Sequence, residues 1–197
     1  MSKLNPIETA RLSLEPWRLA DRDEFDTIRT HPTVCLGGLS AGVGVGVGSN
    51  ITLDHWLKEA EGLPPGLGAW AIRDGARAVV GEVALRPCVW DRAYVEIRCG
   101  ILGDCSEHGF AREAMGAILR YGTGLVGLSE ILALVTAEDR RSVQLVKELG
   151  FHLAPALASG QASGQVYTYQ ASESLDVWEP MGMEPPFPSR GTYWSKE

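Results

Sequence analysis

The chain has 197 residues, of which 45% are hydrophobic and 22% are charged, a balance that is ordinary for one globular domain. With 18 basic and 25 acidic residues and no Lys/Arg-rich run, its net charge of −7 excludes the electrostatic pattern of a nucleic-acid binder and suits an amine substrate better. No apolar stretch approaches the roughly 20 residues of a membrane span, so we expect no membrane partner. The scattered cysteines and the lack of a secretory leader predict free thiols, no metal site and a cytoplasmic location: Cys35, Cys88, Cys99 and Cys105.

The first part of the chain predicts a strand, a helix and a glycine-rich loop. Residues 11–17 alternate like a strand, and residues 19–30 read as a helix that stops before His31-Pro32. Residues 37–48 place glycine at alternate positions, which costs too much backbone entropy for a regular strand. We expect a mobile loop there, either a lid that orders on binding or an exposed insertion with no role.

The middle of the chain predicts a helix followed by an antiparallel meander. Thr52 or Ser49 can cap a helix that runs to residue 61. Three strands follow, at residues 68–73, 78–86 and 93–101. Asp74-Gly75 joins the first two, because this dipeptide is the commonest signal for a hairpin turn.

Residues 106–113, Ser-Glu-His-Gly-Phe-Ala-Arg-Glu, form a turn between an alternating strand at 94–99 and an amphipathic helix at 111–126. At a helix start the first backbone N–H groups have no partner inside the helix and the macrodipole is positive, so a diphosphate can bind without side-chain charge. Gly109 lacks the Cβ that would hold a ligand away from the backbone, and Ala111 keeps the next turn shallow. The junction therefore predicts a site for a phosphorylated ligand.

The last part of the chain completes an α+β domain with a mixed, mostly antiparallel sheet flanked by helices. The predicted elements are a buried strand at 131–136, a helix at 140–149 closed by Gly150, and a strand pair at 151–157 and 165–172. We assign residues 1–172 to the domain and residues 173–197 to an irregular tail. The tail is rich in proline and carries two tryptophans, so it either packs over the domain or stays disordered.

The segment 96–151 resembles the catalytic half of the GNAT superfamily of acyl-CoA-dependent N-acyltransferases, in particular the Rim-type branch that acetylates ribosomal-protein N-termini. The branch has a strand carrying Glu-Ile and then a loop ending Gly-x-Gly-[Tyr/Phe]-Ala-x-Glu-Ala. This chain has Glu96-Ile97 and then, at 107–114, Glu-His-Gly-Phe-Ala-Arg-Glu-Ala. The branch continues with Pro-x-Asn-x-x-Ser and Gly-Phe, where this chain has Ala-Glu-Asp-Arg-Arg-Ser at 137–142 and Gly150-Phe151. The likeness covers roughly residues 8–170 in the right order.

The resemblance implies transfer of an acetyl or other short acyl group from an acyl-CoA, with acetyl-CoA as the nominal cofactor, to a primary amine by direct attack. It implies that the CoA diphosphate contacts the backbone of residues 107–112 and that pantetheine runs along the edge of the strand at 94–101, as an added strand would. The candidate cofactor-binding residues are Ile101, Leu102, Gly103, Ser106, Glu107, His108, Gly109, Phe110, Ala111, Arg112, Asp139 and Ser142.

Glu96 is the preferred catalytic base, because alternation places it on the strand face opposite to Val95 and Ile97. A partly buried carboxylate beside a substrate channel can have a raised pKa, which a base at neutral pH requires. A structural ion pair with Arg98 or Arg86 is an equally supported interpretation. Glu82 is the second candidate for the base. The residues expected to face the acceptor are Asp54, His55, Trp56, Tyr94 and Arg98, and the first two are third-choice bases.

Ser142 is the resemblance-based candidate for the group near the leaving sulfur, because its hydroxyl can donate to a thiolate. The alternative is a serine that only satisfies N–H groups of the first helical turn. The tyrosine that many GNAT enzymes place four residues before the Gly-Phe glycine is absent, since that position is Val146.

Departures from the family pattern predict weakened CoA binding. Glu107 stands where the family has glycine, and Asp139 replaces its asparagine, so each places a negative charge near the cofactor. A second hypothesis is therefore a GNAT fold that has lost the reaction and acts as a CoA sensor or a partner-binding module. The acceptor is either a peptide N-terminus or a small molecule, and a homodimer is one option for its assembly.

Overall fold

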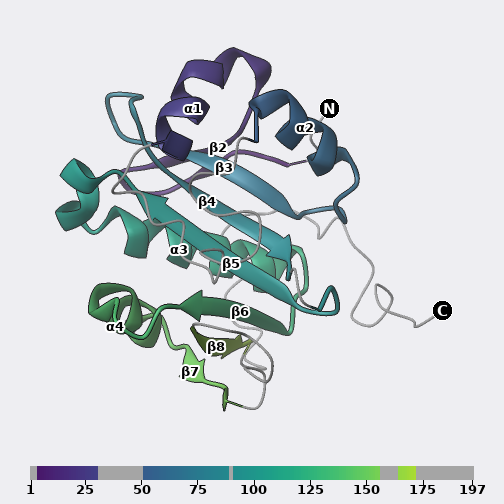
Figure 1. The fold of residues 1–197 in the computed structure, drawn as a ribbon, viewed down its shortest axis with the longest axis vertical. Helices are drawn as coiled ribbons and strands as arrows, with labels where there is room; N and C mark the ends of the chain where they lie inside the picture. The colour runs from purple at the N-terminus through teal and green to yellow at the C-terminus, as the bar shows by residue number, and fades with distance from the viewer. Residues whose placement is uncertain (1–3, 31–50, 89–90, 156–163, 172–197) are drawn as a thin grey trace.

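The computed structural model describes residues 4–30, 51–88, 91–155 and 164–171, drawn in colour in Figure 1. The predicted glycine-rich loop at 37–48 and the tail at 173–197 lie outside the described residues, as do the side chains of Asp104 and Ser106.

An eight-stranded sheet forms the centre, in the order β1-β2-β3-β4-β5-β6-β8-β7 (Figure 1). Neighbouring strands are antiparallel except for β5 and β6, which run parallel. The strands are β1 Ile7–Glu8, β2 Ser13–Pro16, β3 Gly68–Arg73, β4 Val79–Pro87, β5 Val95–Ile101, β6 Glu130–Val135, β7 His152–Leu153 and β8 Gln165–Gln170. The α-helices of the described chain are α1 Arg22–Thr30, α2 Leu53–Glu61, α3 Phe110–Arg120 and α4 Arg140–Glu148. The predicted α+β fold with a mixed, mostly antiparallel sheet is confirmed.

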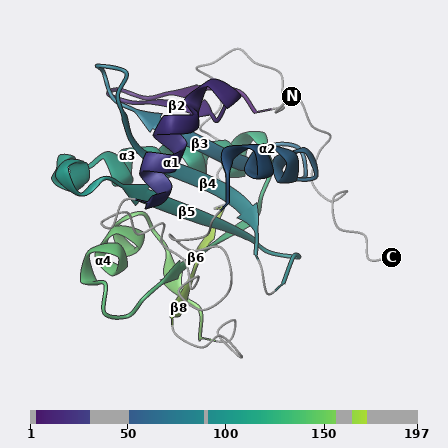
Figure 2. The same cartoon turned by 45° about the horizontal axis from the view of Figure 1, so that its top comes forward.

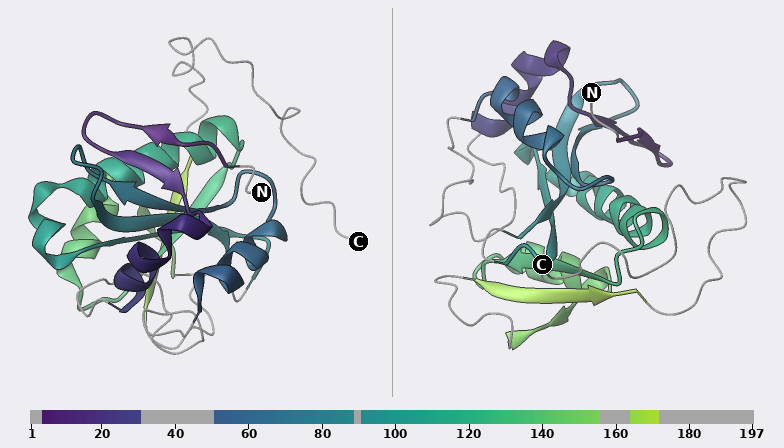
Figure 3. Two further views of the ribbon diagram at one scale, coloured as in Figure 1. Left: turned by 90° about the horizontal axis from the view of Figure 1, so that it is seen from above. Right: turned by 90° about the vertical axis from the view of Figure 1, so that its right-hand side faces the viewer.

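Helices cover both faces of the sheet. On one face, Ile118 of α3 and Val146 of α4 join a core cluster with alternate residues of β3, β4 and β5. On the other face, Phe25 of α1 and Trp56 of α2 pack on the remaining alternate residues of β3 and β4. Figure 2 shows α1 and α2 lying across these strands, and the right panel of Figure 3 shows α3 on the opposite side. Both faces of β4 and β5 are therefore largely covered, and the charged residues Glu82, Glu96 and Arg98 are buried there.

The turn between β3 and β4 is longer than the sequence predicts. The predicted strands leave residues 74–77 between them, whereas the structure leaves 74–78. The Asp74 side chain accepts hydrogen bonds from the N–H groups of Ala76 and Ala78, at 3.0 and 2.9 Å. The positive φ falls on Arg77, at 68°, and the register shifts between Ile72 and Arg73. The aspartate side chain thus organises a wider loop than the dipeptide alone indicates.

Only the first part of the predicted helix at 111–126 is α-helical. It is regular to Arg120 and then continues as a π-helix, Tyr121–Leu125, in which the Val126 N–H donates to the Tyr121 carbonyl at 3.1 Å. A Cβ on Gly122 would lie 2.9 Å from Ile131 Cδ1, so the close packing of this turn on β6 requires a glycine there. Similarly, a 3-10 turn, Leu19–Asp21, replaces the first residues of the predicted helix at 19–30.

The last predicted strand pair forms, but its first member is short. β7 covers only His152–Leu153 of the predicted 151–157, and β8 lies between it and β6. No helix within the four described ranges is long and apolar enough to cross a membrane.

The segment before β2 is tied to the start of α3 through Glu113. The Thr9 hydroxyl and the Arg11 N–H donate to Glu113 Oε1 at 2.6 and 2.8 Å, and Arg11 Nε donates to Oε2 at 2.7 Å. Arg11 Nη1 also donates to the His108 carbonyl at 2.9 Å, and its guanidinium lies 5.1 Å from the centre of the Phe110 ring. This set of contacts fixes the turn that precedes α3.

Replacing Glu113 with Gln should lower the free energy of unfolding by about 1–2 kcal/mol at neutral pH, because hydrogen bonds to a charged group are lost. The loss is no larger because Arg11 is half-exposed, so solvent screens its ion pair with Glu113. Burial acts to raise the pKa of Glu113, but the bonds from Thr9 and Arg11 outweigh it and lower that pKa. The stabilisation is therefore present above the ordinary Glu value of about 4.3 and is lost as the pH falls through the lowered pKa. Urea unfolding of both proteins from pH 7 to pH 2.5 measures it, and a stability difference that grew on acidification would contradict this assignment.

Candidate active site

The parallel ladder between β5 and β6 is short. It pairs Glu96 with Leu132 and Ile97 with Ala133 and does not continue to the ends of the strands. In Figure 1 the two arrows point the same way and separate toward their tips. Beyond Ile97, the edge of β5 facing β6 is therefore not covered by that strand. Such an edge can form main-chain hydrogen bonds with an extended ligand that carries amide groups.

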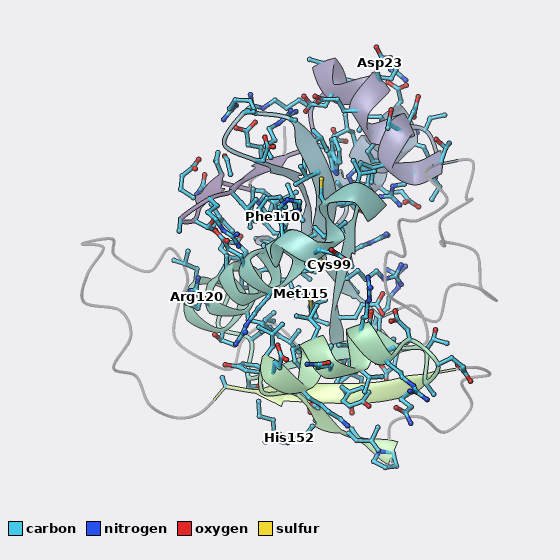
Figure 4. All side chains as sticks on the ribbon, turned by 90° about the vertical axis from the view of Figure 1, so that its left-hand side faces the viewer. Asp23, Cys99, Phe110, Met115, Arg120 and His152 are labelled. Atoms are coloured by element: carbon cyan, nitrogen blue, oxygen red, sulfur yellow. The ribbon has the colours of Figure 1, made fainter. Side chains whose placement is uncertain are left out.

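The chain turns from β5 into α3 through a 3-10 helix, Gly103–His108, and then Gly109. Gly109 has φ 74° and ψ 14°, a left-handed conformation that disfavours any residue with a Cβ. It occupies the N-cap of α3, where a glycine has no side chain to accept from the N–H groups of the first turn. Figure 4 looks onto α3 and α4, with Phe110 labelled at the start of α3. The corner thus has an uncapped helix start with a left-handed glycine, and the binding of an anion there stays a prediction.

Glu96 lies on the face of β5 that is covered by α1 and α2, and only 1% of it is exposed. Its carboxylate contacts the Arg98 guanidinium, so the ion pair weighed from the sequence is present. Burial raises the pKa of Glu96, because it disfavours the charged form by more than Arg98 and Arg86 favour it. Within the described residues, neither carboxylate oxygen has a further hydrogen-bond partner. A buried carboxylate with a raised pKa and spare acceptor capacity is suited to taking up a proton.

Glu82, the second candidate base, is 3% exposed and fully engaged. Arg29 Nη2 donates to both of its carboxylate oxygens, at 2.8 and 3.0 Å, and Trp17 Nε1 donates to Oε2 at 2.7 Å. These bonds join the region of α1 to β4. Glu82 therefore has the surroundings of a structural ion pair, whereas Glu96 keeps acceptor capacity.

Arg86 of β4 lies directly opposite Glu96 in the ladder between β4 and β5. Its guanidinium carbon is 4.5 Å from the centre of the Trp56 ring. Trp56 thus reaches the polar residues on this face from α2, as expected for an acceptor-facing residue. Its neighbours Asp54 and His55 point elsewhere: Asp54 pairs with Arg22 at 2.7 Å, and His55 lies 3.4 Å from Glu59, all with exposed side chains. Tyr94 packs against an apolar cluster of β6 and β8.

The model of the GNAT acetyltransferase domain matches residues 11–152, well over half of the chain. The chain belongs to the GNAT acetyltransferase family. GNAT acetyltransferases use acetyl-CoA, so the enzyme class and the cofactor expected from the sequence are confirmed at the level of the family.

Solved GNAT structures share the fold at low sequence identity. An acetyltransferase from Agrobacterium tumefaciens is 21% identical over 85% of this chain and 95% of its own, with a TM-score of 0.66. A spermidine N-acetyltransferase from Vibrio cholerae, in complex with CoA and spermine, is 15% identical over 82% of this chain and 96% of its own, with a TM-score of 0.62. A Vibrio cholerae protein described as a ribosomal-protein-serine acetyltransferase has a TM-score of 0.63 and is 16% identical over 87% of this chain and 100% of its own. These likenesses support the fold and do not select the Rim-type branch.

The two acidic departures from the GNAT pattern are each accommodated. Glu107 is exposed and lies 4.0 Å from Arg141, so its charge faces solvent and a cation. Asp139 is the N-cap of α4: Oδ1 accepts from the Ser142 N–H at 3.1 Å and Oδ2 accepts from the Ser142 hydroxyl at 2.6 Å. Asp139 and not Ser142 therefore caps the helix, and the Ser142 hydroxyl hydrogen is directed at Asp139. Val146, in place of the usual GNAT tyrosine, is buried.

The remaining cofactor candidates lie around the β5–α3 corner. Ile101 ends β5, and Leu102 and Gly103 lead into the 3-10 helix. The His108 ring stacks on Phe110 with centroids 5.3 Å apart, and Arg112 reaches Glu148 of α4 at 3.6 Å. The sequence did not identify Arg29 or Trp17, since nothing local connects them to β4. Alternation did contain the signal for Arg86, which shares a strand face with Glu82.

Proposed function

We propose that this GNAT domain transfers an acetyl or other short acyl group to a primary amine by direct attack, with Glu96 as the base. The observation that carries the proposal is the buried Glu96 carboxylate, with its raised pKa, at the point where β5 separates from β6. Because Glu96 is 1% exposed, the proton reaches it from an ammonium bound next to it or through one intervening water. Arg98 holds the carboxylate in place.

The β5–α3 corner fits acetyl-CoA, which supplies the activated acetyl group. The N–H groups around Gly109, Phe110 and Ala111 would hold the diphosphate, because the left-handed glycine leaves the first turn of α3 without a side-chain cap. The edge of β5 at Ile101 would bind the pantetheine amides. A shallow pocket of about 490 Å³ on α4 is lined by two cations, Arg140 and Lys147, and Glu148 in its wall links it to α3 through Arg112.

Ser142 as donor to the leaving thiolate stays a prediction. Its hydroxyl hydrogen now points to Asp139, so the role requires the hydroxyl to rotate away from the cap. The Rim-type acceptor, the homodimer and the cytoplasmic location likewise stay predictions. Cys88 and Cys99 form no disulfide within the described part of the chain, which is compatible with a reducing compartment.

Two measurements, made one after the other, test the proposed function. Calorimetric titration with acetyl-CoA and with CoA should show binding of both, and release of free thiol should follow when amines and N-terminal peptides are added. Binding without thiol release from any amine would favour the CoA-sensor hypothesis. If neither acetyl-CoA nor CoA bound at millimolar concentration, the proposed acetyltransferase activity would be contradicted.

Replacing Gly109 with Ala should lower stability by about 1–2 kcal/mol, because alanine disfavours φ 74°. It should also weaken CoA binding by roughly tenfold, equivalent to about 1.4 kcal/mol, as the first-turn N–H groups move. A Cβ there would meet only Arg11 Nη2, at 3.7 Å, so backbone conformation and not crowding causes the effect. Gly109→Asn should recover part of both losses, since asparagine tolerates the left-handed region.

Gly75→Ala is the matched control for this variant, because a Cβ on Gly75 meets nothing within 4 Å. Thermal unfolding and calorimetric titration with CoA measure the two effects. If Gly109→Ala kept the CoA affinity of the native protein while losing stability, the corner would be structural and would not bind the diphosphate.

A further inference from the structure

Among the described residues between β4, β5 and the helices α1 and α2, three arginines accompany two buried carboxylates, Glu82 and Glu96. Glu82 pairs with Arg29, and Glu96 pairs with Arg98. Within the described ranges, Arg86 forms no hydrogen bond or ion pair, and its one close partner is the uncharged Trp56 ring. Glu59 attracts it from α2, but the Glu59 carboxylate is 3.4 Å from His55 instead.

Arg86 is half-buried but its guanidinium is still reachable. Burial and the nearby Arg98 lower the pKa of Arg86, which shows that its charge is poorly compensated where it lies. No nitrogen of Arg86 is among the described side-chain atoms that are sealed from solvent without a hydrogen-bond partner. The unpaired nitrogens of Arg86 therefore keep contact with solvent, from which a ligand can approach.

The contact with Trp56 leaves the hydrogen-bond donors of Arg86 available. The guanidinium carbon lies 4.5 Å from the centre of the ring, a cation–π contact that uses no conventional hydrogen-bond acceptor. The N–H groups at the edge remain in one plane, which matches the two oxygens of a carboxylate. Packing against Trp56 also limits the conformations of a long side chain, so less entropy is lost on binding.

Arg86 and Glu96 are direct partners across an antiparallel pair, so their side chains start from the same face with Cα atoms about 5 Å apart. A negative group and a positive group thus lie side by side. A molecule with the opposite pair of charges, an ammonium and a carboxylate, matches them. A plain amine would bring only a cation toward the positive charge of Arg86, which repels it.

We infer that the acceptor is a small amino acid-like molecule, whose carboxylate binds the Arg86 guanidinium while its amine lies at Glu96. This inference rests on the proposed function, since it names the substrate class of the same site. It separates this domain from one that acetylates a bare polyamine, and it gives Trp56 a positioning role behind Arg86.

Matched acceptors test the inference. Beta-alanine, beta-alaninamide and propylamine differ mainly in whether they carry a carboxylate, and rates are compared per concentration of free amine because the amine pKa values differ. Thiol release with acetyl-CoA should give kcat/KM at least tenfold higher for beta-alanine than for the other two. Glycine and gamma-aminobutyrate then vary the spacing between the amine and the carboxylate.

Arg86→Gln should remove this preference, mainly through a higher KM for beta-alanine, while the rate with propylamine should not fall, because a charge that repels plain amines is removed. Arg86→Lys keeps the charge without the planar pair of donors and should retain part of the preference. Arg120→Gln is the matched control, because Arg120 is exposed on α3, on the other face of the sheet. Calorimetric titration with CoA should show the same affinity in all of these proteins.

Two results would overturn the inference. Equal use of beta-alanine and propylamine by the native protein would show that the carboxylate is not recognised. An equal loss of rate for both amines in Arg86→Gln, with unchanged CoA affinity and thermal stability, would make Arg86 part of the general site. The proposed function itself fails in a different way, by the absence of thiol release with every amine, and the inference falls with it.

Discussion

Replacing Glu96 with Gln is expected to lower kcat for acetyl transfer on the order of 100- to 10,000-fold, the range that a general base contributes. The amide keeps the size of the side chain but cannot take up the proton. Burial raises the pKa of Glu96, so the native rate should fall as the pH drops through that raised pKa and the carboxylate becomes protonated. In the variant this acid limb should disappear. Initial rates of thiol release from pH 5 to pH 9 measure both effects.

The alternative for Glu96 is a purely structural ion pair with Arg98. In that case Glu96→Gln would change thermal stability and leave the shape of the pH profile as it is in the native protein. Glu61→Gln, at an exposed position at the end of α2, is the matched control and should change neither. An unchanged kcat in a folded Glu96→Gln protein would show that the base lies elsewhere.

Replacing Glu82 with Ala should lower the free energy of unfolding by roughly 3–5 kcal/mol, because it leaves Arg29 as an uncompensated charge in the interior. Arg29 is 6% exposed, and the Trp17 N–H would lose its acceptor as well. The double replacement Glu82→Leu with Arg29→Leu removes both charges and should recover most of the loss. Urea unfolding of the single and double variants measures this.

The same Glu82 variants separate the two candidate bases. If Glu82 is structural, a Glu82→Gln protein that remains folded should keep the acid limb of the pH profile. A loss of that limb at normal stability would move the base from Glu96 to Glu82. A cost below about 1 kcal/mol for Glu82→Ala would contradict the assignment of a buried ion pair.

Local patterns were enough to predict most of the secondary structure and the corner that follows β5. Gly109 before a helix, Thr52 at a helix start and the alternation in β5 each act within a few residues, so they can be read directly from the sequence. The turn at Asp74-Gly75 is one residue longer than the predicted strand bounds leave, because the Asp74 side chain binds N–H groups up to four residues away. The early end of α3 depends on how closely Gly122 packs on β6, which is a tertiary contact.

The electrostatic state of the candidate site was beyond the reach of local patterns. Alternation placed Glu82 and Glu96 on one face of the sheet, but it could not rank them. The ranking depends on Arg29 and Trp17, which lie 53 and 65 residues from Glu82 in the chain. The lack of a carboxylate partner for Arg86 among the described residues can likewise be recognised only once Arg29 is assigned to Glu82 and Arg98 to Glu96.

The contacts of Arg11 determine which part of the protein can neutralise a bound nucleotide. This side chain is next to the helix start, yet its donors are spent on Glu113 and the His108 carbonyl and its flat face covers Phe110. Arg11 thus connects two segments that lie 102 residues apart in the chain. The diphosphate of a bound nucleotide is therefore stabilised by main-chain dipoles and not by this side chain. The affinity for the nucleotide should therefore change when residues near the N-terminus are altered, for example by a tag or a truncation.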